Sequence, residues 1–248
     1  MKLFSAVALT ALVVFPLASQ ASAVTSYFDR IQTASWHADI PALTELSKQL
    51  NTTAANNDAE TGYAAAYADY RLACAGMKDP KQYSAVTDAA LERADNRLST
   101  LSQRETPYQA ESLALLSTVY GMKIGISPAK SPVLGIMSGR AIAQAEKLAP
   151  DNPRVQLFKG VGKLYTPAMF GGDRAQALTA INAAIATLSG QRGSTVNWGL
   201  DDAYIWRGIA LQSGGQANEA KASFEKALAV APEHEWAKHL LAEMNKSR

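Results

Sequence analysis

The sequence predicts an all-α protein built from antiparallel helix pairs, and three observations carry this prediction. Apolar residues recur at spacings of three and four from Ser26 onward, as they do along one face of a helix. The alternation at a spacing of two that is typical of strands does not recur. Residues that cap helices stand directly before proline at regular intervals, which fits helices of ordinary length joined by short loops.

Residues 1–23 predict a secretory signal peptide. Lys2 is followed by an apolar run over residues 3–17 and then by Ala21-Ser22-Ala23, an A-x-A cleavage pattern. The apolar run is shorter than the roughly 20 residues that a membrane-spanning helix needs. We therefore expect a mature chain, 24–248, that is exported and soluble, periplasmic or secreted, and free of a membrane segment.

Composition narrows the function classes further. Lys and Arg number 24 and Asp and Glu number 22, so the net charge is near zero and a nucleic-acid partner is not expected. The single cysteine, Cys74, has no partner for an internal disulfide, and its apolar surroundings predict a buried, inert thiol. Hydrophobic packing must therefore hold the chain together.

Four dipeptides predict helix starts in the middle of the chain. In each, a side chain able to accept hydrogen bonds from free backbone N–H groups precedes a proline, which is favoured at the first helical position. These dipeptides are Asp79-Pro80, Thr106-Pro107, Ser131-Pro132 and Asn152-Pro153. The apolar stripe after the first of them consists of Tyr83, Val86, Ala90, Leu91, Ala94, Leu98 and Leu101.

The segment 201–234 has a more specific spacing of small and large residues. Gly208 is followed at +7 by Gly215, and then come, in order, Ala220, Phe224, Ala227 and Pro232. Small residues let two antiparallel helices cross closely, the second glycine allows the turn, and proline ends the second helix. This segment resembles the tetratricopeptide repeat (TPR), a helix-turn-helix unit of 34 residues. It departs from the family pattern with Tyr204 in place of tryptophan and Arg207 in place of leucine.

The resemblance extends upstream with less regular spacing. Gly160, Ala177, Ile181 and Ala184 take the places of Gly208, Ala220, Phe224 and Ala227, with five extra residues between the two helices. The clearest repeats are 132–189 and 201–234, and the segment 233–246 is expected to be a capping helix. The resemblance implies one TPR-like domain over 24–248, a right-handed solenoid of about five helix pairs plus that C-terminal helix.

Catalytic and metal-binding patterns are not found in the sequence. His234 and His239 are five residues apart, about 140° around a helix, whereas a zinc-protease motif places its two histidines four apart on one face. We expect both to be solvated. Asp201 and Asp202 are expected to be a helix cap and a first-turn acid. The sequence therefore predicts no enzyme, no metal site and no cofactor.

The stretch "LYTPAMFGGDRAQAL", 164–178, offers two interpretations of its glycine pair. A phosphate loop would need a following lysine or a preceding strand, and neither is present. Asp173 would also occupy the helix start and repel an anion. The pattern favours a lengthened turn between two helices, with Asp173 as the cap and Phe170 packed into a neighbouring pair.

The family resemblance implies a binding surface on the concave face of the stacked pairs. The positions that match its inward-facing ones are Arg154, Leu157, Val161, Leu164, Tyr165, Asp202, Ile205, Ile209, Gln212 and Ser213. An adaptor that binds a segment of another protein there is the first hypothesis. One alternative is a binding protein for a small apolar or amphipathic ligand, accessory to transport. Another is a concave face filled by the chain's own segments. Trp198, in the glycine-rich link 189–201, is expected to fold back over helix ends.

Overall fold

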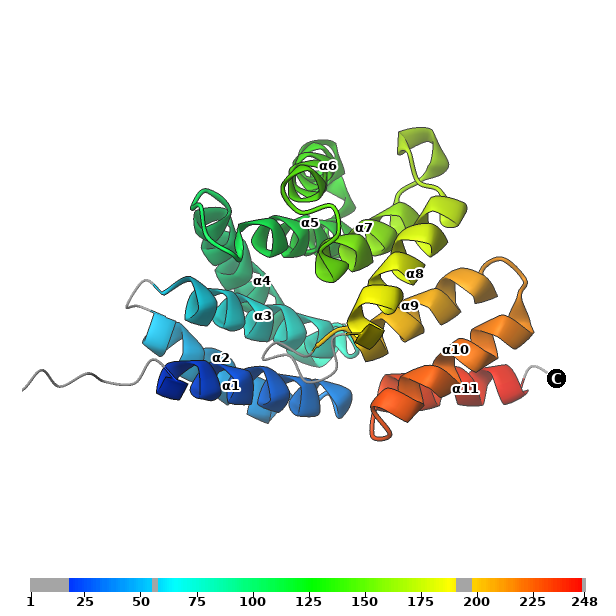
Figure 1. Ribbon diagram of the computed structural model, residues 1–248, viewed down its shortest axis with the longest axis horizontal. Helices are drawn as coiled ribbons and strands as arrows, with labels where there is room; N and C mark the ends of the chain where they lie inside the picture. The colour runs from blue at the N-terminus through cyan, green and yellow to red at the C-terminus, as the bar shows by residue number, and fades with distance from the viewer. Residues whose placement is uncertain (1–17, 55–57, 191–197, 247–248) are drawn as a thin grey trace, which may run out of the picture.

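The computed structural model describes residues 18–54, 58–190 and 198–246. Within these ranges the regular structure is entirely helical. The helices follow one another as antiparallel pairs, each packed mainly on its neighbours along the chain. Together they form a curved stack, with α1 and α11 at opposite sides of its lower edge (Figure 1). The predicted all-α solenoid of helix pairs is therefore confirmed.

Five pairs and a last helix make up the described part of the stack. The first helices of the pairs are α1 (Ala18–Trp36), α3 (Ala59–Gly76), α5 (Gln109–Ile126), α7 (Pro153–Tyr165) and α9 (Leu200–Gln212). Their partners are α2 (Ile40–Thr53), α4 (Pro80–Ser102), α6 (Ser131–Leu148), α8 (Arg174–Gly190) and α10 (Ala217–Val230), followed by α11 (Glu235–Lys246). Two short 3₁₀ turns, η2 (Pro128–Lys130) and η3 (Ala168–Phe170), lie between helices.

The predicted signal peptide falls mostly outside the described residues, which begin at residue 18. Helix α1 runs through the expected cleavage point after Ala23 and continues to Trp36. Its described side chains include Phe28 and Ile31, which are buried in the core. The leader therefore stays a prediction, and the part of α1 that follows it belongs to the folded body.

Two of the four predicted helix starts are capped as expected. Asp79 accepts a hydrogen bond from the Gln82 N–H, and Asn152 accepts from the two N–H groups that follow Pro153. The other two predictions are wrong in detail. Helix α5 begins two residues after Pro107, because the Thr106 carbonyl first closes a turn with the Gln109 N–H. Helix α6 begins at Ser131, which lies inside the helix because the preceding 3₁₀ turn runs directly into it.

The core is largest in the N-terminal part of the stack. Almost every residue of α3 is buried, including Tyr63 and Tyr67, since α1, α2, α4 and α5 all pack on it. This core continues through α5 into α7. Smaller clusters link α7, α8 and α9, and then α9, α10 and α11. The stack is thus held together by contacts between successive layers.

Glycines allow close helix crossing in the two repeats that the sequence singles out. A Cβ added at Gly208 would lie 2.3 Å from the Phe224 ring, and one added at Gly160 would lie 2.5 Å from the Ile181 side chain. Phe224 and Ile181 therefore pack within their own pairs, against the glycine of the first helix.

Candidate functional site

Half of the positions predicted to line the concave groove are buried within the chain itself. Five of its ten positions are buried, namely Arg154, Leu157, Val161, Asp202 and Ile205. Leu164 and Ile209 are half-buried, and only Tyr165, Gln212 and Ser213 are exposed. The exposed positions lie at the C-terminal ends of α7 and α9 or just beyond them. The open part of this face is therefore confined to those helix ends.

Trp198 covers the Arg154 end of this face. It is 2% exposed, and its ring stacks on Tyr67 with a centroid distance of 4.2 Å. The Arg154 guanidinium lies 4.6 Å from the Trp198 ring and is also paired with Glu111 at 3.1 Å. The prediction that Trp198 folds back over helices is confirmed. Because Tyr67 is on α3, Trp198 joins the N-terminal pairs to α7 and α9.

An aromatic row crosses the first helices of the C-terminal pairs. The Tyr165 ring meets Trp206 edge-on at 5.7 Å, and Trp206 meets Trp236 edge-on at 5.3 Å. Both tryptophans are half-buried, whereas Tyr165 is 65% exposed. Such edge contacts stabilise aromatic pairs. The row fixes the orientation of Tyr165 at the solvent-facing end of α7.

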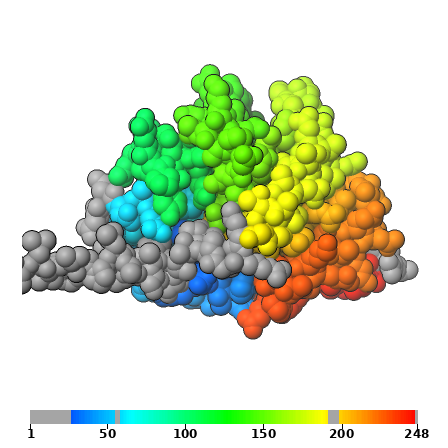
Figure 2. Space-filling view, in the orientation of Figure 1, coloured from blue at the N-terminus to red at the C-terminus, as the bar shows by residue number. Residues whose placement is uncertain are grey.

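The turn after α7 presents two further apolar side chains to solvent. Met169 and Phe170 are 83% and 72% exposed. The prediction that Phe170 packs into a neighbouring helix pair is therefore wrong. The 3₁₀ turn carries it outward, and Figure 2 shows the region of this turn, in yellow-green, as a separate projection at the upper edge of the molecule. We call Tyr165, Met169 and Phe170 the apolar edge.

Backbone constraints hold this turn in one conformation. Gly171 has φ of +91°, a left-handed value that favours glycine. A Cβ on Gly172 would lie 1.7 Å from the Thr166 carbonyl oxygen, so a side chain is excluded there. The Lys163 ammonium donates to the Gly171 carbonyl at 2.9 Å. Asp173 accepts from the Gln176 N–H at 3.0 Å, which confirms it as the cap of α8. The glycine pair thus shapes an ordered turn between helices.

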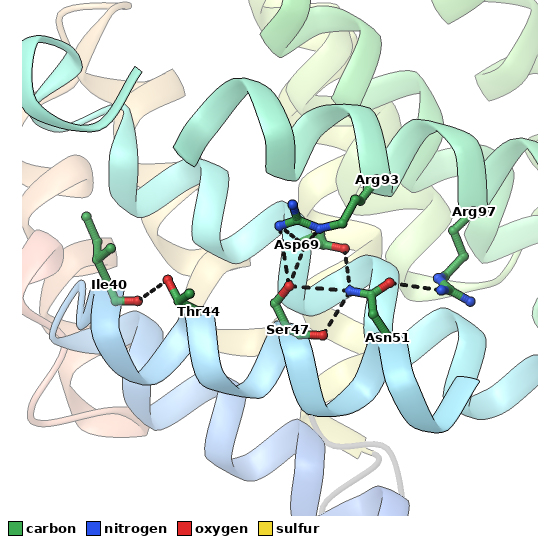
Figure 3. A network of polar contacts seen from close by, with 7 residues as sticks. All are labelled: Ile40, Thr44, Ser47, Asn51, Asp69, Arg93 and Arg97. Carbon is green, nitrogen blue, oxygen red and sulfur yellow. Dashed lines mark hydrogen bonds and ion pairs between the residues drawn. The ribbon is translucent and has the colours of Figure 1, made fainter. Parts of the chain in front are cut away.

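A polar cleft that the sequence did not reveal lies between α2 and α4. Its volume is about 450 Å³, and most of its lining residues are polar, among them Arg93, Arg97 and Arg104. Figure 3 shows the polar network to which two of the lining arginines belong: Arg93 binds the buried Asp69 carboxylate at 2.7 Å, and Arg97 donates to Asn51 at 2.8 Å. Arg93 and Arg97 lie on α4, and Arg104 follows the end of this helix. The Asp69 carboxylate also accepts hydrogen bonds from Ser47 at 2.6 Å and from Asn51 at 3.0 Å, so this network joins α2, α3 and α4.

Comparisons with solved structures agree with this architecture. The chain is similar to TTC0263, a thermophilic TPR protein in Thermus thermophilus, with 18% identity, a TM-score of 0.57, and coverage of 88% of this chain and 98% of that one. The fold is TPR-like, an all-α solenoid of helix pairs. It is also similar to the HusA haemophore from Porphyromonas gingivalis, with 20% identity, a TM-score of 0.61, and coverage of 80% and 94%. No family model and no curated protein sequence matches the chain.

The two ends of this TPR-like stack meet at a polar junction. The Trp36 indole at the end of α1 donates to Asp201 at 2.7 Å, and Arg71 of α3 binds Asp202 at 2.9 Å. Asp201 and Asp202 are both buried in the first turn of α9, and Asp201 is not the helix cap because Gly199 precedes the helix. His37 reaches Glu233 at 3.1 Å from the other side.

His234 belongs to the same junction. It is 3% exposed, so the prediction that it is solvated is wrong. Burial lowers the pKa of His234 to about 4, and burial together with the neighbouring Asp202 raises the pKa of Asp201 to about 6. At neutral pH the imidazole is therefore neutral, and the Asp201 carboxyl is ionised in most molecules.

Proposed function

We propose that this chain is a non-catalytic adaptor that binds a segment of another polypeptide against the apolar edge. The observation that carries the proposal is the exposure of Met169 and Phe170 on an ordered turn. Large apolar side chains that stay in water contribute nothing to the chain's own core. A fixed turn that holds them outward fits a contact with a partner, and aromatic anchors of this kind commonly dominate protein interfaces.

The shape of the edge favours a macromolecular partner. Sites for small molecules are usually concave and enclose most of the ligand. The apolar edge is instead a projection, and Tyr165 connects it to the aromatic row at Trp206. A groove or pocket on a partner would enclose Phe170, while the row offers a flatter surface beside it. TPR-like solenoids commonly supply such extended binding surfaces.

We further propose that the adaptor works outside the cytoplasm, after removal of residues 1–23. The leader pattern in the sequence supports this compartment. No helix within the described ranges combines the length and apolar character of a membrane span. The test is mass spectrometry of the N-terminus of protein isolated from its own cells, with Val24 expected as the first residue. An N-terminus at Met1 or Lys2 would contradict the proposed export.

Site-specific photocrosslinking tests the binding surface. A photoreactive amino acid replaces Phe170 in one sample and Val133 in another, because Val133 is an apolar residue of similar exposure, 64%, on α6. We expect one dominant polypeptide adduct from position 170 in the native compartment and none of that adduct from position 133. The same adducts from both positions, or none from either, would count against the apolar edge.

A second candidate is the binding of a small apolar or amphipathic ligand. The observation that favours it is the similarity in fold to a protein named as a haemophore. Native mass spectrometry of the purified chain distinguishes the two candidates. A retained small molecule, or a stoichiometric mass increase after addition of haem, supports this candidate. Unchanged mass together with a polypeptide adduct at position 170 supports the adaptor.

A further inference from the structure

The polar junction brings together three side chains of the kinds that bind metal ions. One oxygen from each carboxylate of Asp201 and Asp202 and one ring nitrogen of His234 lie within 4.8 Å of one another. All three residues are buried, and they come from two places, the first turn of α9 and the turn between α10 and α11. Ligand atoms of one tetrahedral zinc ion are about 3.4 Å apart, so small side-chain movements would bring this set into range.

The state of the His234 side chain distinguishes this cluster from an ordinary group of acidic residues. Both of its ring nitrogens are buried, and neither has a hydrogen-bond partner among the residues that the structure describes. A buried polar group normally has a partner, and the absence of one has a cost that calls for an explanation. A neutral imidazole with a free nitrogen lone pair is the form that binds metal ions. The unpartnered imidazole therefore points to a ligand at this position.

We propose that Asp201, Asp202 and His234 form a site for a divalent cation that accepts both nitrogen and oxygen ligands, such as Zn²⁺. Two carboxylates and one imidazole leave a fourth position for water. The Arg71 guanidinium is ion-paired with Asp202 and balances one of the two carboxylates. The remaining negative charge, enclosed and away from water, attracts a cation and excludes anions.

Further residues surround the three proposed ligands and orient two of them by hydrogen bonds. Ligating carboxylates are usually oriented by hydrogen bonds from further residues. Here the Trp36 indole donates to Asp201 at 2.7 Å, and Arg71 donates to Asp202 at 2.9 Å. Both donors lie in the N-terminal half of the chain. A bound cation would therefore link α9 to the turn before α11 and strengthen the contact of both with α1 and α3.

The test uses the full chain after treatment with a chelator and dialysis. Isothermal titration with Zn²⁺ at pH 7 should show one site per chain, and thermal unfolding should shift to higher temperature with added Zn²⁺. Co²⁺ at the same site should give a visible absorption band from its nitrogen and oxygen ligands. His234→Ala removes one ligand, and we expect a loss of affinity of more than about 100-fold, beyond the range found for outer-layer residues.

His239→Ala is the matched control, because His239 is exposed on α11 and lies outside the cluster. It should bind Zn²⁺ as the unaltered chain does. Asp201→Asn is the second variant, since it keeps the side-chain shape and an acceptor for Trp36 while it removes the charge. It should also lose the site, with a helical circular dichroism spectrum that shows it to be folded. Absence of Zn²⁺ binding, or equal affinity in the His234→Ala and His239→Ala variants, would overturn the proposal.

Discussion

Replacement of Trp198 by alanine is the most direct test of how the concave face is filled. The ring is almost completely buried, lies against Tyr67 on one side of the stack and has the Arg154 guanidinium 4.6 Å from its centre. Alanine would leave a cavity between the N-terminal pairs and α7. It would also remove the surface that covers Arg154.

The expected loss follows from the buried area. An aromatic side chain buries about 150–250 Å², which corresponds to about 4–6 kcal/mol at about 25 cal/mol per Å². Substitutions of this type commonly cost about 3–5 kcal/mol, and loss of the cation–π contact contributes to the same total. We therefore expect the free energy of unfolding to fall by about 4 kcal/mol in Trp198→Ala.

Urea unfolding followed by circular dichroism measures this change. The slope of the transition should stay the same while the midpoint falls, because the extent of exposed surface changes little. Met169→Ala is the matched control: its side chain is 83% exposed, so its effect should stay within about 0.5 kcal/mol. A loss below about 1 kcal/mol in Trp198→Ala would refute the filled concave face and return the groove hypothesis.

Three further predictions follow from packing and charge. Gly208→Ala should lower the free energy of unfolding by about 1–3 kcal/mol, because its Cβ would lie 2.3 Å from the Phe224 ring. Gly121→Ala is the control, since its Cβ meets open space and alanine should stabilise the helix. Equal melting temperatures for the two variants would contradict this prediction. Leu157→Asp should lower the free energy of unfolding by more than about 3 kcal/mol, because the aspartate charge would replace a side chain that is 1% exposed. An unchanged melting temperature would indicate that Leu157 lies at the surface. Burial raises the pKa of Tyr63, Tyr67 and Tyr70 well above the usual tyrosine value, so the unfolded chain loses these protons first. Stability should therefore fall above about pH 10, by about 1.4 kcal/mol per pH unit for each of the three side chains, and equal urea midpoints at pH 8 and 11 would contradict this.

Local sequence patterns predicted the elements of the fold well. The apolar stripe of the segment after Pro80 matches the buried face of α4, where Ala90, Leu91 and Leu98 enter the core. Asp79, Asn152 and Asp173 cap helices as expected, since a cap depends only on the residues of one turn. The spacing around Gly208 predicted a close helix crossing for the same reason.

Local sequence patterns could not predict contacts between distant parts of the chain. Trp36 and Asp201 are 165 residues apart, and nothing in the periodicity of either helix indicates that they meet. His234 was therefore expected in water. A concave face filled by the chain's own segments was one of the alternatives, but the sequence did not indicate that Trp198 would contact Arg154 there. Tyr165, one residue of the apolar edge, was among the positions predicted for the concave binding surface. Phe170 was identified as unusual but assigned to the core, because an apolar residue is buried more often than exposed.

The affinity of the crosslinked partner segment for variants at the apolar edge tests the proposed function most directly. The segment captured at position 170 is synthesised and titrated with the unaltered chain, Phe170→Ala and Val133→Ala. An interface anchor contributes about 2 kcal/mol or more, so Phe170→Ala should raise Kd by about 30-fold or more, and Val133→Ala should leave it within about twofold. Equal dissociation constants for the unaltered chain and Phe170→Ala would contradict the proposal that the apolar edge is the binding surface.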